Sequence, residues 1–214
     1  MRTTVTARAA VLLVAVSSLL WALAGCGSAP PRPSAQAGPA VPFAGCADLT
    51  GTTATTGTTA TTGTTTTTGA TTTAGASLPD LALPCYAGGP DIDLTAVRGP
   101  AVINLWASWC APCRSELPVL QAFADRHAGQ VRVIGVVSMD ERAAALGLAD
   151  DLDLRFPQLD DRDGRLMRAV ERTALPVTVF VDRAGRVRDL YNGRALDRRT
   201  LDGLAGRHLG LVPA

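Results

Sequence analysis

The chain has 214 residues, a formal net charge of +1 at pH 7 and 47% hydrophobic residues. This length allows one ordinary domain with appendages, and the balanced charge argues against a polyanionic partner. No stripe of basic residues interleaved with aromatic residues runs along the sequence, so we expect no nucleic-acid partner.

The N-terminus has the pattern of an export signal, which we assign to residues 1–25. Two arginines precede an apolar run over residues 9–24 that only two serines interrupt. This run has about the length of a signal-peptide core and is short for a membrane-spanning helix. It ends in "LAGC", which resembles the lipobox of bacterial lipoproteins, so Cys26 is predicted to carry a lipid. An ordinary cleaved signal with a chance cysteine and an uncleaved anchor helix are the alternatives.

Residues 26–76 are predicted to be a disordered tether. Proline, alanine, glycine and serine dominate its first part, and threonine-rich repeats fill the stretch from Thr50 to Ala76. The repeats contain no large apolar residue, so burial cannot offset the entropy cost of ordering them. A flexible chain of about 50 residues would reach on the order of 40 Å from a membrane anchor. Glycosylation of the threonines and a repeat expansion without a role are both open.

A globular pattern begins at Leu78, and the folded domain is assigned to residues 77–214. Buried strands joined by helices and followed by a hairpin predict an α/β fold, a mixed sheet with helices on both faces. The expected elements, in chain order, are short strands within 78–88 and 90–99, a strand over 100–108, a helix over 112–128 kinked at Pro118, a strand over 131–138, a helix near 141–149, a polar loop, a strand over 176–182, its hairpin partner over 186–191 and a helix over 197–209.

Cys110 and Cys113 lie between the strand over 100–108 and the helix over 112–128. The unpaired N–H groups and the dipole at a helix N-terminus favour negative charge. The Cys110 thiol should therefore ionise more readily than a free cysteine and act as the nucleophile. Cys113, one turn into the helix, would attack a mixed disulfide and release the partner. The pattern thus predicts a reactive dithiol.

Two tryptophans precede this dithiol. We expect Trp106 and Trp109 to form a flat apolar surface for the substrate, with Pro112 beside them near the first helical position. Packing in the core is the alternative for both tryptophans, and it weighs most for Trp106.

The segment "NLWASWCAPCRSELP" resembles the active site of the thioredoxin superfamily, in its TlpA/ResA/DsbE branch of exported, membrane-tethered thiol–disulfide oxidoreductases. Further likeness lies in "LPDLAL" and "LPVTVFVDRAGRV", and the resemblance spans residues 78–212. It implies a thioredoxin-like fold and protein thiols or disulfides as substrates. It also implies a membrane electron donor or acceptor, and a location on the extracytoplasmic face of the cell membrane. No cofactor and no metal ion are expected.

The resemblance also implies roles for single residues. Pro176 matches the cis-proline that faces the dithiol in the superfamily, and the backbone of Leu175 would pair with a substrate strand. A trans-proline at a strand start is the default from the residues alone. Glu116 would take the proton from Cys113, with a solvated helix glutamate as the alternative. Asn104 replaces the buried aspartate of thioredoxins proper, a departure that suits the TlpA-like branch.

Two further cysteines, Cys46 and Cys85, flank the threonine-rich tract. Disulfides persist outside the cytoplasm, and an even number of cysteines is left after Cys26 is set aside. Our hypothesis is a structural disulfide that fixes the region of residue 46 to the domain and loops out the tract. Unpaired or intermolecular thiols are the alternative.

The direction of electron flow stays open at this stage. A reductant of the cytochrome c maturation type is favoured, and an oxidant of secreted proteins is the alternative, because the residues between the cysteines do not fix the reduction potential. A Cu(I) metallochaperone is the rival from another class, since two thiolates can hold Cu(I). A peroxiredoxin-type peroxidase is rejected, because Ala107 stands where such an enzyme needs Thr or Ser. His127 and His208 are expected at the surface.

Overall fold

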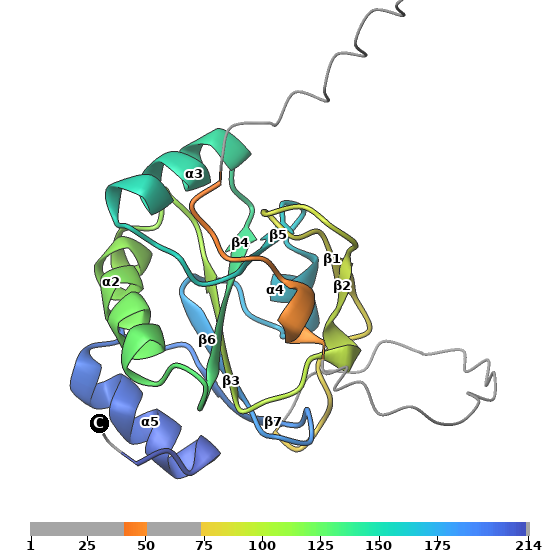
Figure 1. The fold of residues 1–214 in the computed structure, drawn as a ribbon, viewed down its shortest axis with the longest axis vertical. Helices are drawn as coiled ribbons and strands as arrows, with labels where there is room; N and C mark the ends of the chain where they lie inside the picture. Colours follow the sequence, from red (N-terminus) through yellow and green to blue (C-terminus); the bar gives the residue numbers. More distant parts are fainter. Residues whose placement is uncertain (1–40, 51–73, 213–214) are drawn as a thin grey trace, which may run out of the picture. The chain divides into compact units, whose positions relative to one another are not determined.

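The computed structural model describes residues 41–50 and 74–212, so the predicted signal peptide, Cys26 and most of the predicted tether lie outside it. Five strands form the main sheet in the order β5-β4-β3-β6-β7, and β1 and β2 form a separate two-stranded sheet (Figure 1). Within the described ranges, no helix is both long enough and apolar enough to cross a bilayer.

Apart from β5, α4 and the two short 3-10 turns, the elements follow the expected order along the chain. The strands are β1 (Ala82–Leu83), β2 (Ile92–Asp93), β3 (Ala101–Trp106), β4 (Arg132–Ser138), β5 (Gln158–Asp161), β6 (Val177–Val181) and β7 (Val187–Tyr191). The α-helices are α2 (Ala111–Arg126), α3 (Arg142–Asp151), α4 (Arg165–Ala169) and α5 (Arg198–Leu209), and the 3-10 turns are η1 (Ala47–Leu49) and η2 (Leu94–Ala96). Pro118 lies inside α2, and the helix continues past it.

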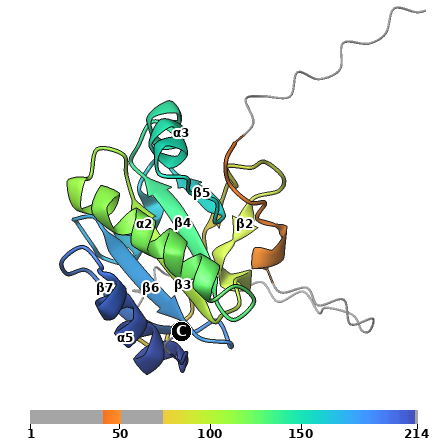
Figure 2. The ribbon, with the colours of Figure 1, turned by 60° about the vertical axis from the view of Figure 1, so that its left-hand side comes forward.

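The sheet is mixed, as predicted. β3 pairs in parallel with β4, and β4 with β5, whereas β6 runs antiparallel to both β3 and β7. Helices α2 and α3 are the crossover connections of the parallel part, and they lie with α5 against one face (Figure 2). Helix α4 and the β1–β2 hairpin cover the other face. The predicted α/β fold with helices on both faces is therefore confirmed.

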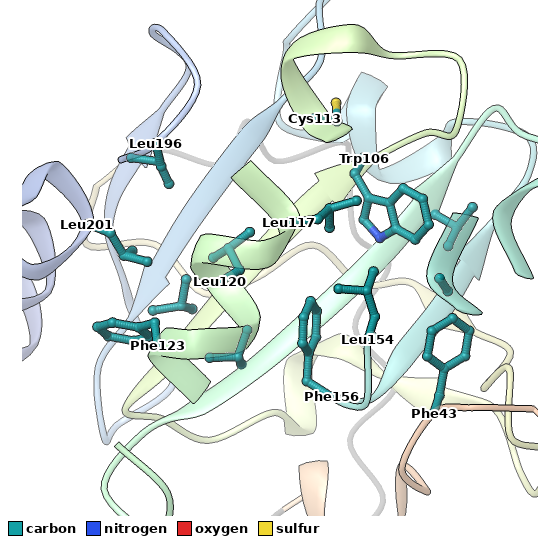
Figure 3. Packing of buried hydrophobic residues seen from close by; sticks show 14 of the residues in the cluster. Phe43, Trp106, Cys113, Leu117, Leu120, Phe123, Leu154, Phe156, Leu196 and Leu201 are labelled. Atoms are coloured by element: carbon teal, nitrogen blue, oxygen red, sulfur yellow. The ribbon is translucent and has the colours of Figure 1, made fainter. Parts of the chain in front are cut away.

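Alternation along β3 divides the core into two layers. Val102 and Trp106 face α2, whereas Ala101, Ile103 and Leu105 face α4 and the hairpin. All six residues of β3 are buried, as expected for a central strand covered on both faces. Figure 3 shows the α2 layer, in which the start of α2 lies directly over Trp106. The dithiol thus sits on the packed core of the domain.

Strand β5 and helix α4 occupy the stretch that was predicted to be a polar loop, and that prediction is wrong. Gln158 and Asp161 of β5 are polar but buried, because each has fixed partners. The amide of Gln158 accepts a hydrogen bond from the indole of Trp106. The Asp161 carboxylate accepts from the N–H groups of Arg165 and Leu166 and so satisfies two unpaired donors in the first turn of α4.

The boundary of the predicted tether is also corrected. Residues 41–50 pack against the domain, with Phe43, Cys46 and Leu49 buried. Phe43 packs edge-on against Tyr86, with ring centroids 5.7 Å apart. Apolar side chains in an otherwise polar stretch, with a covalent link beside them, give this segment enough buried surface to order it.

The described residues at both ends of the threonine-rich tract are bonded to the domain. Thr50 forms a bridge with Val97, and the N–H of Gly75 donates to the Val187 carbonyl. Ser77 forms an antiparallel bridge with Arg186, the residue before β7. Both ends of the tract are therefore attached to the same domain, so the length of the tract does not add to the spacing between Cys26 and the domain.

A disulfide joins Cys46 to Cys85, which lie 39 positions apart in the sequence, with their Cα atoms 6.1 Å apart. Both cysteines are buried. Cys85 forms an isolated antiparallel bridge with Leu159, so the segment that follows β1 covers the free edge of β5. The disulfide thus fixes the N-terminal segment at an edge that would otherwise expose unpaired backbone groups.

The histidine assignments need one correction. His127 is buried against Phe123, with ring centroids 4.5 Å apart, and is not a surface residue. Nε2 of the half-buried His208 lies 3.4 Å from a carboxylate oxygen of Asp189.

We predict that the double substitution Cys46→Ser/Cys85→Ser lowers the free energy of unfolding by about 3–4 kcal/mol, since the disulfide closes a long loop in the unfolded chain. Urea denaturation of both proteins in the oxidised state measures this. A double serine variant of Cys110 and Cys113, which close a much shorter loop, should lose less. A loss below about 1 kcal/mol, or free alkylation of both cysteines in the wild type, would contradict the structural role.

Candidate active site

The dithiol lies at the N-terminus of α2. Cys110 is the N-cap residue, and its sulfur is bonded to that of Cys113, with Cα atoms 5.3 Å apart. The Cys110 sulfur also accepts a hydrogen bond from the Cys113 N–H at 3.2 Å. Cys110 keeps 5% of its surface exposed, whereas Cys113 has none. Of the two sulfurs, the one on Cys110 is therefore the one that another molecule can reach.

The turn that presents Cys110 is tied to the end of β4. The Cys110 N–H donates to the Ala107 carbonyl, and the N–H and hydroxyl of Ser108 both donate to the carboxylate of Asp140. Asp140 also accepts from the N–H of Glu141 at 2.8 Å. One buried carboxylate thus fixes the β3–α2 turn against the β4–α3 turn.

The two tryptophans have different roles. Trp109 is 61% exposed beside the dithiol, and its indole N–H donates to the carbonyl of Met139 at 3.0 Å. Trp106 is fully buried under α2, so the expectation that it belongs to the substrate surface is wrong. Trp106 is the last residue of β3, and its side chain packs in the layer between the sheet and α2 (Figure 3). The alternative of packing in the core is therefore the correct one.

The indole of Trp106 depends on a close fit across the sheet. Its N–H donates to the Gln158 side-chain oxygen at 2.9 Å. The Gln158 amide occupies the space that a Cβ on Gly135 of β4 would need, so only glycine is compatible with this arrangement. The sequence pattern did not reveal the role of Gln158 or Gly135, because the two residues come into contact only when β4 pairs with β5.

Glu116 is completely buried in the first half of α2. One carboxylate oxygen accepts from the side-chain amide of Asn104 at 2.7 Å, and the other accepts from the N–H of Leu196 at 2.9 Å. Asn104 also donates to the hydroxyl of Thr178 at 3.0 Å. The solvated-glutamate alternative is therefore wrong. A spacing of three residues places Glu116 on the same side of the helix as Cys113.

The charge of Glu116 is poorly compensated. Burial raises the pKa of this carboxyl, and the hydrogen bonds from Leu196 and Asn104 offset the shift only in part. Both donors are neutral groups. A carboxyl of this kind binds a proton more readily than a solvated one, which suits the predicted acceptor role toward Cys113.

Pro176 lies at the end of the sheet where β3 leads into the dithiol. Val177 pairs with Leu105, so Pro176 and Leu175 come just before the start of β6 at this end. The Leu175–Pro176 peptide bond is cis. Pro176 is buried, Leu175 is half-buried and Pro112 is exposed. The structure thus brings the predicted residues to one end of the sheet, apart from Trp106, which lies beneath them.

Several contributors to the site were not predicted. Asp140 lies two residues after the end of β4, and an acidic residue so near the end of a buried strand could have been predicted as part of the site. The N–H of Leu196 is a backbone group in the β7–α5 loop, and the sequence carries no signal for it. Among the described residues, no group of three His, Cys, Asp or Glu side chains is placed to hold a metal ion.

Comparison with known proteins agrees with this geometry. Residues 74–190 match the model of the AhpC/TSA family. The chain belongs to this family. It is 35% identical over 137 residues to the thiol:disulfide interchange protein DsbE of Pseudomonas fluorescens biotype C, covering 63% of this chain and 75% of that protein. It is 28% identical over 124 residues to the thiol-disulfide oxidoreductase ResA of Oceanobacillus iheyensis, covering 57% of this chain and 62% of that protein.

A solved structure shows the same fold. The secreted thiol-disulfide isomerase of Corynebacterium glutamicum is 25% identical and superposes with a TM-score of 0.52, covering 60% of this chain and 82% of that one. The predicted thioredoxin-like relationship is confirmed. The protein is an enzyme, a thiol–disulfide oxidoreductase of the DsbE/ResA type.

The raised pKa of Glu116 predicts a pH-dependent effect of Glu116→Gln on stability. The folded-state pKa lies above the ordinary value of 4.5, so stability from the neutral form is present below that value. It is lost as the pH rises through the folded-state pKa. The unfolding free energy of the variant relative to wild type should therefore increase from about pH 4 to pH 8. Urea denaturation across this range measures it, and a constant difference would contradict the assignment.

Proposed function

We propose that the protein exchanges disulfides with exported polypeptides outside the cytoplasm and that it works as a reductant, as in cytochrome c maturation. The observation that carries the exchange reaction is the geometry of the dithiol. One sulfur is reachable at the N-terminus of a helix, and the other is buried behind it.

In the reduced enzyme, the Cys110 thiolate attacks one sulfur of a substrate disulfide. A mixed disulfide forms, and the first substrate sulfur leaves as a thiolate that takes up a proton. Glu116 accepts the proton of Cys113, whose thiolate then attacks the Cys110 sulfur. This step forms the Cys110–Cys113 disulfide and releases the second substrate thiol. Two electrons have passed to the substrate, and an electron donor at the membrane must return them.

The surroundings of the dithiol favour a reductant. A strong oxidant stabilises its reduced form through its thiolate. Here the Cys110 sulfur accepts one hydrogen bond within the described residues, from the Cys113 N–H. Glu116, buried on the same side of α2, has only neutral donors as partners, so its negative form would oppose a neighbouring thiolate. The negative charge of Glu116 thus disfavours the reduced dithiolate and lowers the reduction potential. The single hydrogen bond to the Cys110 sulfur acts in the opposite direction, because it favours the thiolate.

An extracytoplasmic location is supported by two independent features. Residues 1–25 have the pattern of an export signal, and Cys46 and Cys85 form a buried disulfide away from the active site. Disulfides of this kind persist in oxidising compartments. Lipid attachment at Cys26 would hold the enzyme at the outer face of the cell membrane.

The surface that meets the polypeptide substrate would be formed by Trp109, Pro112, Leu175 and Pro176.

A redox titration of Cys110 and Cys113 against glutathione and dithiothreitol tests the direction. We expect a reduction potential below about −150 mV, and a higher value would favour the oxidant alternative.

Insulin reduction by dithiothreitol tests the exchange reaction itself. The wild-type protein should accelerate it and Cys110→Ala/Cys113→Ala should not, whereas Cys46→Ser/Cys85→Ser should remain active wherever it is folded. No acceleration by the wild type would overturn the proposed reaction.

A further inference from the structure

Leu175 has free backbone groups at the active-site end of the sheet. Among the described residues, neither its N–H nor its carbonyl forms a hydrogen bond, although the carbonyls on both sides of it do. Its side chain is half-buried and packs against both layers of the core. The side chain is therefore held while the backbone is left open to another strand.

Both neighbouring carbonyls are bonded to one side chain, that of Asn192. Its amide nitrogen donates to the Ala174 carbonyl at 3.0 Å and to the Pro176 carbonyl at 2.6 Å. A primary amide has two N–H groups, so both bonds form at once. No acidic or aliphatic side chain could supply this pair of donors.

Asn192 is itself held in a braced turn after β7. The hydroxyl of Tyr191 donates to the Arg194 carbonyl at 3.1 Å. A Cβ on Gly193 would come within 2.7 Å of the Tyr191 hydroxyl oxygen, so the tyrosine side chain closes over the glycine. This packing fixes the backbone of the turn from which the Asn192 side chain extends.

The same loop also reaches the buried carboxylate of the active site. Leu196, four residues after Asn192, donates its N–H to Glu116 at 2.9 Å. Glu116 is in turn bonded to Asn104, which also bonds Thr178 in β6. The β7–α5 loop therefore touches both the segment before β6 and the proton acceptor on α2.

We propose that Asn192 is a positioning residue for the polypeptide substrate. By holding the carbonyls of Ala174 and Pro176, it keeps the Leu175 N–H and carbonyl directed toward an incoming strand. The substrate pairs with Leu175 in an extended conformation and so presents its disulfide to Cys110. A small disulfide that lacks a polypeptide strand gains nothing from this contact. The inference rests on the proposed exchange with polypeptide substrates.

The test compares two substrates with three variants. Asn192→Ala and the nearly isosteric Asn192→Asp both remove the N–H donors, and Arg194→Gln changes a neighbouring side chain that has no bond to Ala174 or Pro176. We expect KM for insulin to rise roughly three- to tenfold in both Asn192 variants, which corresponds to one or two lost hydrogen bonds. The rate with a small aromatic disulfide, and both rates of Arg194→Gln, should change less than about twofold.

Each other outcome overturns a defined statement. An unchanged KM for insulin in both Asn192 variants would show that the two bonds do not position the substrate. Equal losses with insulin and with the small disulfide would mean that Asn192 supports the dithiol instead, which also overturns the inference. A wild-type protein that reacts with the small disulfide but not with insulin would remove the proposed polypeptide exchange itself. Thermal unfolding of every variant separates these results from loss of the fold.

Discussion

The structure depends on the joint between β3 and α2, where the chain passes from a buried strand into a helix through Cys110. At the N-terminus of a helix, the first backbone N–H groups have no partner within the helix, and capping side chains or water satisfy them. Here a sulfur takes this place, as the acceptor of the Cys113 N–H. The same bond that begins the helix therefore orients the reactive atom. A nucleophile on a loop would lack this fixed direction.

Buried polar groups around this joint are held from several elements at once. Asp140 fixes the turn before α2. Glu116, one helical turn after Cys113, accepts hydrogen bonds from Asn104 in β3 and from Leu196 in the β7–α5 loop. A buried polar group is costly unless its partners are placed correctly. The network thus stabilises one arrangement of β3, β6, α2 and the last loop, and this arrangement is what the chemistry needs. Fold specificity and reactivity share the same residues.

The sequence predicted the parts that depend on local pattern. Continuous apolar runs predicted β3, β4 and β6, and the helical periodicity after Cys110 predicted α2 within two residues at either end. It failed at β5, because Gln158 and Asp161 are satisfied by partners from other elements. The assignment of Phe43 and Leu49 to a tether failed for a related reason. Two apolar residues in a polar stretch become ordered only when a distant surface receives them.

The active site divides in the same way. The spacing of the cysteines and Glu116 is local and could be read directly from the sequence. The continuous apolar run of β3, which predicts burial on both faces, also favoured a core position for Trp106. The contributions of Asn192 and of the Leu196 N–H arise from tertiary contacts. No pattern in a single sequence predicts which backbone carbonyls the side chain of a surface asparagine will hydrogen-bond.

The most direct test of the central claim is to trap the reaction at its midpoint. Cys113→Ser and Cys110→Ser, each reduced, are mixed with an unfolded polypeptide that carries one disulfide, and the products are separated without reductant. The account predicts that Cys113→Ser accumulates a covalent adduct through Cys110, whereas Cys110→Ser accumulates little, because its remaining sulfur is buried. Equal or greater trapping by Cys110→Ser would contradict the assignment of Cys110 as the attacking sulfur.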